Sequence, residues 1–107
     1  MQHPQLAQIL NELRQHFRML YGSRLERLMV FGSQARKDAD ADSDIDVMVV
    51  LLGEVDAWAE IERTGELVAN LCLAYGVVIC NIFVSADRYR AQDCALIRNV
   101  VQEGIPL

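Results

Sequence analysis

Two residue pairs, one Gly-Ser and one Asp-x-Asp, separated by ten residues, carry the chemistry that this sequence is best suited to perform. Gly32 and Ser33 follow the apolar stretch LERLMVF, and Asp44 and Asp46 precede the apolar run VMVVLL. Side chains two residues apart in a strand point to the same face of a sheet, so the two carboxylates can hold one divalent metal ion. Magnesium binds carboxylates and substrate phosphates together, and a glycine before a helix offers backbone N–H groups to phosphates. The two pairs therefore predict one site for phosphoryl or nucleotidyl transfer.

The arrangement resembles the minimal nucleotidyltransferases of the DNA polymerase β superfamily, whose signature is Gly-Ser, a spacer and Asp-x-Asp on the following strand. The ten-residue spacer is that of the MNT antitoxins that pair with HEPN-domain toxins, and the motif GS-x-AR…SDID also matches the usual sequence of that family. The resemblance extends over nearly the whole chain. It implies that nucleotide is bound by Gly32, Ser33, Arg36 and Ser43, and that Asp44 and Asp46 bind Mg²⁺ and are catalytic.

One position departs from that pattern. Enzymes of the superfamily use a third carboxylate from a neighbouring strand, but this sequence has no acid between Glu66 and Asp87. We expect Asn81, in the middle of the stretch VVICNIFV, to occupy the third-acid position. An amide oxygen coordinates metal weakly and cannot take a proton, and the loss of a metal ligand or base costs orders of magnitude in rate.

Two classes of function follow. The first is a magnesium-dependent nucleotidyltransferase that moves AMP from ATP to an acceptor hydroxyl; the resemblance implies a tyrosine of a HEPN toxin, with this chain as the antitoxin. The second is a catalytically impaired module that binds nucleotide or partner and neutralises the partner by contact alone. The intact Gly-Ser and Asp-x-Asp pairs favour the first, and the absent third acid favours the second. Antibiotic adenylylation is a weaker alternative, because those enzymes usually carry an additional substrate-binding domain.

Each motif also has a structural interpretation. Gly-Ser after a strand is most often a turn and a helix cap. The alternating acids from Asp38 onward could form a solvated loop or a calcium loop, but an EF-hand counted from Asp38 would have Ser43 in place of its glycine and Val49 in place of its glutamate. Arg36 could bind a phosphate or only pair with a neighbouring surface acid, and both remain open.

Composition and charge are those of a small domain spanning residues 1–107. The net charge of −5 argues against an extended nucleic-acid surface. Cys72, Cys80 and Cys94 lack disulfide or zinc spacing, so we expect buried thiols in a reducing cytoplasm. No signal pattern is present and the longest apolar run is too short to span a bilayer, which predicts a cytoplasmic protein. Homo-oligomer formation is left open.

The order of elements predicts an α/β fold, an α+β arrangement in which helices flank a small mixed sheet, as in polymerase β-like nucleotidyltransferases. Apolar residues at helical spacing begin near Pro4 and end at Tyr21. The further elements are strands at 25–31, 47–52 and 77–84, a short helix at 33–37 and longer helices at 58–75 and 87–103. The strand at 47–52, which is apolar on both faces, is expected in mid-sheet.

Several further residues are expected to serve packing rather than chemistry. His3 and His16 lie far in sequence from the acids and are not expected to act as a base. The residues expected in the core are Met19, Met29, Met48, Ile97, Val100 and Val101, and those expected in the core or an interface are Trp58, Tyr75 and Tyr89.

Overall fold

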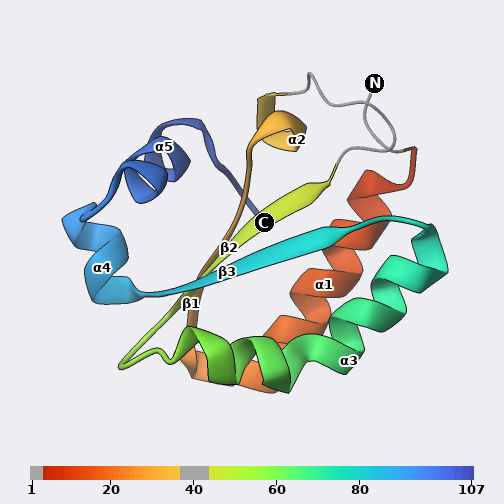
Figure 1. The fold of residues 1–107 in the computed structure, drawn as a ribbon, viewed down its shortest axis with the longest axis horizontal. Coiled ribbons are helices and arrows are strands. Elements are labelled where there is room, and N and C mark those ends of the chain that lie inside the picture. Colours follow the sequence, from red (N-terminus) through yellow and green to blue (C-terminus); the bar gives the residue numbers. More distant parts are fainter. Residues whose placement is uncertain (1–3, 37–43) are drawn as a thin grey trace.

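The computed structural model describes residues 4–36 and 44–107, in which a mixed sheet carries helices on both faces (Figure 1). In chain order the elements are α1 (Leu6–Tyr21), a 3-10 turn η1 (Gly22–Arg24), β1 (Leu25–Phe31), α2 (Ser33–Arg36), β2 (Ile45–Leu51), α3 (Ala57–Tyr75), β3 (Ile79–Ser85), α4 (Ala86–Ala91), α5 (Ala95–Glu103) and β4 (Ile105–Pro106). The expected fold class is confirmed. Within the described ranges, no helix combines the length and apolar character that crossing a bilayer requires.

The sheet has the strand order β3-β2-β1-β4 within the described residues. β1 pairs antiparallel with β2 and with the short β4, and β2 pairs parallel with β3. β2 therefore lies inside the sheet, as its apolar sequence predicts, and every residue of β2 except Asp46 is buried.

Strand alternation divides the core into two clusters. Odd-numbered residues of β2 and β3 pack with α1 and α3 on one face of the sheet. Even-numbered residues of the same strands pack with α4 and α5 on the other face. The first cluster includes Ile9, Leu13, Phe17, Val47, Val49 and Phe83, and the second includes Met48, Val50, Val84, Tyr89, Ile97 and Val100. The parity of a strand residue thus decides which face its side chain occupies.

A buried polar contact joins α1 to α3. The hydroxyl of Tyr21 donates to Oε1 of Glu60 over 2.7 Å, and Glu60 is only 3% exposed. Arg24 and Arg63 supply positive charge to the same carboxylate at 3.5 and 3.2 Å. The buried charge of Glu60 is therefore paired, which is the condition for keeping a carboxylate in a core.

The C-terminal helix predicted at 87–103 is wrong in one respect, because the structure has two helices there. Gln92 adopts a left-handed conformation (φ 49°) that ends α4, and α5 begins at Ala95. The carboxylate of Asp93 forms an ion pair with Arg88, 2.8 Å away. The left-handed residue is a glutamine, so neither Gly nor Pro marks this break in the sequence.

Some expected core residues are exposed. Met19 is 85% exposed and Val101 lies at the surface, so the expectation that they are core residues is wrong. Trp58 is 69% exposed and is therefore not a core residue, and its alternative assignment to an interface stays a prediction. Their helices are each covered on one face only, and these residues lie on the other face. Met29, Met48, Ile97, Val100 and Tyr89 are buried as expected. The cysteines are free, but Cys80 is exposed and the other two only half-buried, which corrects the expectation of buried thiols.

Candidate functional site

The glycine and the second aspartate lie against each other. Phe31, the last residue of β1, pairs with Asp46 of β2, so Gly32 emerges from the sheet beside that carboxylate. A Cβ atom at position 32 would lie 2.7 Å from Oδ2 of Asp46, closer than such atoms approach, and Gly32 has a positive φ of +71°. The structure thus brings together two halves of the predicted site that are well separated in sequence.

Asp44 and Asp46 share the face of the sheet that carries α4 and α5. Asp44 directly precedes β2 and is exposed, whereas Asp46 is half-buried within the strand. Burial, and then the negative charge of Asp44, raise the pKa of the Asp46 carboxyl. A cation bound between two neighbouring carboxylates stabilises their negative charges.

The donor set suits Mg²⁺ that completes its coordination with substrate and water. In the described residues no group of three or more His, Cys, Asp or Glu side chains could hold a metal ion. Magnesium typically uses one or two carboxylates together with phosphate oxygens and water, so Asp44 and Asp46 fit it in chemistry and number.

The short helix α2 follows Gly32 directly. Gln34 and Ala35 are buried, 1% and 9% exposed, and fix this helix against the sheet. The backbone of Ser33 starts the helix, as the sequence predicts. Ser43 lies outside the described residues, and the side chains of Ser33 and Arg36 are likewise not described, so their expected contacts with nucleotide stay predictions.

The structure does not place Asn81 beside the acids. In the parallel ladder, Asn81 aligns with Val47, and it shares the face of the sheet that α1 and α3 cover. There it lines a cavity of about 310 Å³ with Thr64 and Phe83, and its Oδ1 is buried with no hydrogen-bond partner. The expectation that Asn81 occupies the third-acid position is therefore wrong.

Cys80 occupies the position expected for Asn81. It aligns with Asp46 across the parallel ladder, and it shares the face of the acids because its parity matches theirs. Although Cys80 is exposed, partial desolvation by its surroundings, followed by the charges of Asp44 and Asp46, raises the pKa of its thiol. The side chain beside the acids is therefore a neutral thiol at neutral pH, which is a poor general base.

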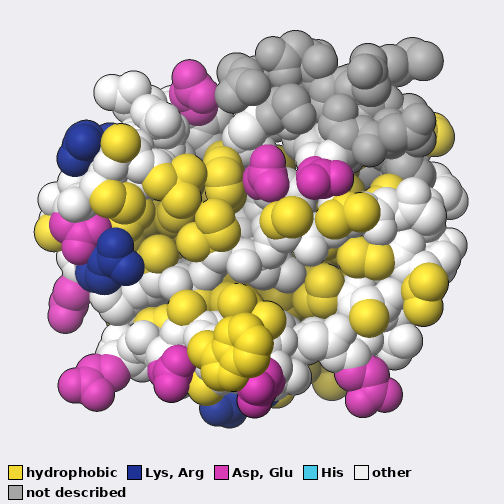
Figure 2. All heavy atoms as spheres, viewed as in Figure 1, with side chains coloured by type: hydrophobic (Ala, Val, Ile, Leu, Met, Phe, Trp, Pro, Cys, Tyr) yellow, Lys and Arg dark blue, Asp and Glu magenta, His cyan; other side chains and the backbone are white. Residues whose placement is uncertain are grey.

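The space-filling view is consistent with an acidic site open to solvent (Figure 2). Two acidic side chains lie next to each other in the upper part of this face, with hydrophobic side chains beside and below them. The coloured Lys and Arg side chains in this view lie at its left and lower margins. A site in such surroundings would need a bound cation to receive a polyphosphate.

Comparison with known sequences gives a consistent picture. The family model described as nucleotidyltransferase domain matches residues 6–105. A candidate protein adenylyltransferase of Methanocaldococcus jannaschii is 33% identical over 85 residues, which cover 78% of this chain and 79% of that protein.

Solved structures of similar fold include two toxin–antitoxin complexes. One, determined with AMP-PNP, has a TM-score of 0.65 and 23% identity, and the match covers 90% of this chain and 69% of that chain. The MntA–HepT complex matches with a TM-score of 0.53 and 22% identity over 91% of this chain and 68% of that chain. A candidate nucleotidyltransferase from Sulfolobus solfataricus has a TM-score of 0.53 and 22% identity over 92% of this chain and 72% of that chain. At these identities the likeness concerns the fold.

Proposed function

We propose a function for this chain, which belongs to the nucleotidyltransferase domain family. It is a magnesium-dependent adenylyltransferase that moves AMP from ATP to a hydroxyl group of a partner protein. The contact between Gly32 and Asp46 carries the proposal. It joins the turn that would receive the phosphates to the carboxylates that would hold the metal, with no room for a side chain at position 32. The choice of AMP rests on the name of the M. jannaschii relative and on AMP-PNP in one structural neighbour.

In this proposal each residue has a limited task. Asp44 and Asp46 hold Mg²⁺, which when bound would supply positive charge to the phosphates. The backbone after Gly32, at the start of α2, would hold the terminal phosphates, and Arg36 and Ser43 would add contacts to the nucleotide. Transfer forms a bond from the acceptor oxygen to the α-phosphorus and breaks the bond from that phosphorus to the bridging oxygen. Pyrophosphate leaves with the electron pair, and the hydroxyl proton passes to water.

The proposed acceptor is a tyrosine hydroxyl of a HEPN-type toxin, with this chain as its antitoxin in the cytoplasm. Toxin–antitoxin complexes are among the similar structures, which supports a toxin partner. The resemblance of the Gly-Ser to Asp-x-Asp spacing to that of the MNT antitoxins supports the same choice.

A second candidate is a nucleotide-binding or partner-binding module without catalysis. The observation that favours it is Cys80, because the strand next to the acids carries a neutral thiol where a third carboxylate would assist. An assay that follows both AMP transfer and ATP binding distinguishes the two candidates.

Incubation of the chain with ATP labelled at the α-phosphate, Mg²⁺ and a HEPN protein encoded beside it tests the proposal. We expect label on the HEPN protein, and none when EDTA replaces Mg²⁺ or when the Asp44→Asn/Asp46→Asn variant is used. Asp87→Asn, a change of equal charge at an exposed position on α4, should behave like the parent. Binding of ATP and of the HEPN protein without label transfer would favour the second candidate. Label transfer in the absence of metal would contradict the assignment of Asp44 and Asp46 as a magnesium site.

A further inference from the structure

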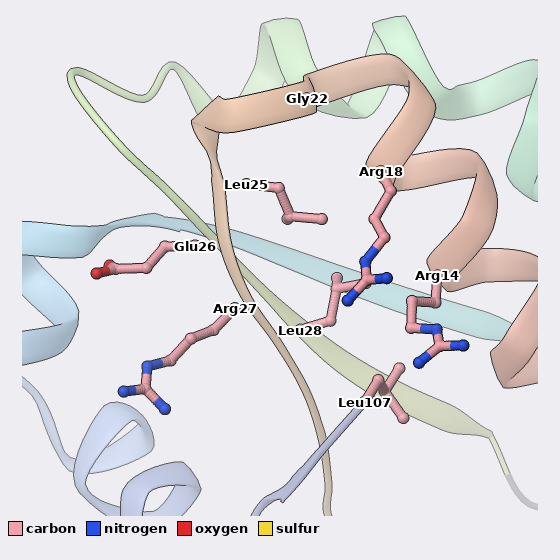
Figure 3. Close-up of a pocket in the computed structure, with 8 residues that line it drawn as sticks. All are labelled: Arg14, Arg18, Gly22, Leu25, Glu26, Arg27, Leu28 and Leu107. Atoms are coloured by element: carbon pink, nitrogen blue, oxygen red, sulfur yellow. The ribbon is translucent and has the colours of Figure 1, made fainter.

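A second pocket lies between α1 and the first half of β1, away from the acids. It has a volume of about 330 Å³, and it is walled by two arginines of α1 and by apolar residues of β1 and the chain end (Figure 3). Leu25 pairs with Leu51 at one end of the β1–β2 ladder, and Phe31 pairs with Asp46 at the other end. The pocket extends along β1 to Leu28, which at about 3.3 Å per residue is roughly 10 Å from Phe31, but Leu28 packs on the face of the sheet that α1 and α3 cover. The acids share the opposite face, so the pocket is distinct from the proposed nucleotide site.

Arg14 and Arg18 extend into this pocket from consecutive turns of α1. Figure 3 shows the guanidinium of Arg18 directed toward Leu28 and that of Arg14 directed toward Leu107. Residues four apart on a helix are neighbours, and like charges at this spacing repel each other. The arrangement therefore concentrates positive charge in one small pocket.

Neither of these arginines has a carboxylate partner among the described residues. Arg14 donates through Nη2 to Oδ1 of Asn11 at 3.0 Å, but its Nε is buried without a hydrogen-bond partner. The guanidinium of Arg18 has no hydrogen bond or ion pair within the described part of the chain. By contrast, Arg24, Arg63, Arg88 and Arg90 each pair with an acid.

The other charged residues that border the pocket are engaged elsewhere. Oε1 of Glu26 pairs with Arg90, whereas its Oε2 is buried without a hydrogen-bond partner among the described residues. The guanidinium carbon of Arg27 lies 5.6 Å from the centre of the Tyr89 ring. Both side chains point away from the two arginines of α1 in Figure 3. An incoming anion would therefore meet Arg14 and Arg18 without direct competition from Glu26.

We propose that this pocket binds a phosphomonoester, with its phosphoryl group between Arg14 and Arg18 and its organic part against Leu25, Leu28 and Leu107. A guanidinium presents a planar fork of N–H donors that matches phosphate or carboxylate oxygens. A carboxylate carries one charge and suits one fork, whereas a phosphoryl dianion can satisfy both. The buried Nε of Arg14 is a donor whose desolvation such an oxygen would offset.

Arginine side-chain NMR tests this site without ATP or Mg²⁺. The Nε–Hε resonances of Arg14 and Arg18 are followed at constant ionic strength during separate titrations with inorganic phosphate, phenyl phosphate and benzoate. We expect saturable shifts of both resonances, with phenyl phosphate binding about tenfold more tightly than benzoate, a difference of about 1.4 kcal/mol. Tighter binding of benzoate would overturn the assignment to phosphate. Equal affinity for inorganic phosphate and phenyl phosphate would overturn the role of the leucines.

Matched variants separate this pocket from a general charge effect. Arg18→Gln, at an exposed position that should not disturb folding, should weaken phenyl phosphate binding about tenfold, because a charge-assisted hydrogen bond is lost. Arg14→Lys keeps the charge but removes the fork, and should also weaken binding. Arg98→Gln, an equal charge change on α5, should bind like the parent. Equal weakening by Arg98→Gln would overturn the site. The Asp44→Asn/Asp46→Asn variant should bind phenyl phosphate as the parent does. This expectation holds whether or not the chain transfers AMP, so the two proposals can fail separately.

Discussion

Asp46 and Cys80 lie opposite each other in the parallel ladder between β2 and β3, and their side chains share one face of the sheet. This pairing decides where a third carboxylate could act. The residue one position along, Asn81, faces the opposite side and lines the cavity beside α3. A single step along a strand therefore separates the proposed active site from the core.

Cys80→Asp should raise AMP transfer, because it adds a charged oxygen ligand and a possible base beside the acid pair. A tenfold gain in rate corresponds to about 1.4 kcal/mol of barrier. The measurement is the initial rate of label transfer at saturating Mg²⁺ and ATP. Asn81→Asp is the matched control, and it should give no gain and should lower the free energy of unfolding by about 1–3 kcal/mol, because it places a charge where Oδ1 is buried without a partner. A gain with Asn81→Asp but not with Cys80→Asp would contradict the register.

Gly32→Ala should damage both stability and nucleotide binding. The new Cβ would meet Oδ2 of Asp46 at 2.7 Å, and the alanine would also have to adopt a positive φ. Gly53→Ala is a suitable control, because Gly53 has a φ of +82° but open space around its Cβ position. We expect about 1 kcal/mol of destabilisation at position 53 and more at position 32.

Urea unfolding and calorimetric titration with ATP measure the two effects. Only Gly32→Ala should weaken ATP binding. Equal losses of stability in the two variants would mean that the contact with Asp46 relaxes freely, and the steric argument would then fail.

Much of the site follows from local sequence. The proximity of Gly32 and Asp46 could be predicted from the sequence, because strands that follow each other in the chain are usually neighbours in the sheet. The alternation that groups Asn81 with Ile79 and Phe83 was also predictable, and the structure confirms it. The face of the sheet on which Asn81, Ile79 and Phe83 lie could not be predicted. It depends on the register between β2 and β3, and a long helix connects these two strands in the chain.

Other differences arise from tertiary context. The break between α4 and α5 depends on a left-handed glutamine and on the ion pair of Arg88 with Asp93, which a helical apolar pattern does not reveal. The exposure of Met19 and Trp58 depends on which faces of α1 and α3 meet the sheet. Apolar periodicity predicts that a helix is buried on one side, but it does not identify every residue beyond the edge of that side.

The stability of the protein should depend on pH through Asp46. Because its pKa is raised in the folded state, the folded protein holds this proton more tightly than the unfolded chain does. The free energy of unfolding should therefore fall as pH rises from the ordinary aspartate range through the raised pKa, and then level off for this group. Mg²⁺ binds the deprotonated carboxylates and should offset this loss at the higher pH.

Urea unfolding at a series of pH values, with and without Mg²⁺, measures this dependence. Asp46→Asn should remove the part of the slope that Asp46 causes and should abolish the effect of Mg²⁺, whereas Asp87→Asn should retain both. An unchanged slope in Asp46→Asn would show that the titration belongs to another group.

Tyr21→Phe should destabilise the packing of α1 on α3. The variant removes the donor to the buried carboxylate of Glu60 while leaving Arg24 and Arg63 in place, so we expect a loss of about 1–3 kcal/mol in the free energy of unfolding. Tyr75→Phe removes a comparable hydroxyl, which donates to Glu12, but at a part-buried position where water can replace it. The loss for Tyr75→Phe should be smaller, and urea unfolding of both variants under the same conditions makes the comparison. A larger loss at position 75 would show that burial of the acceptor is not what gives the Tyr21 contact its strength.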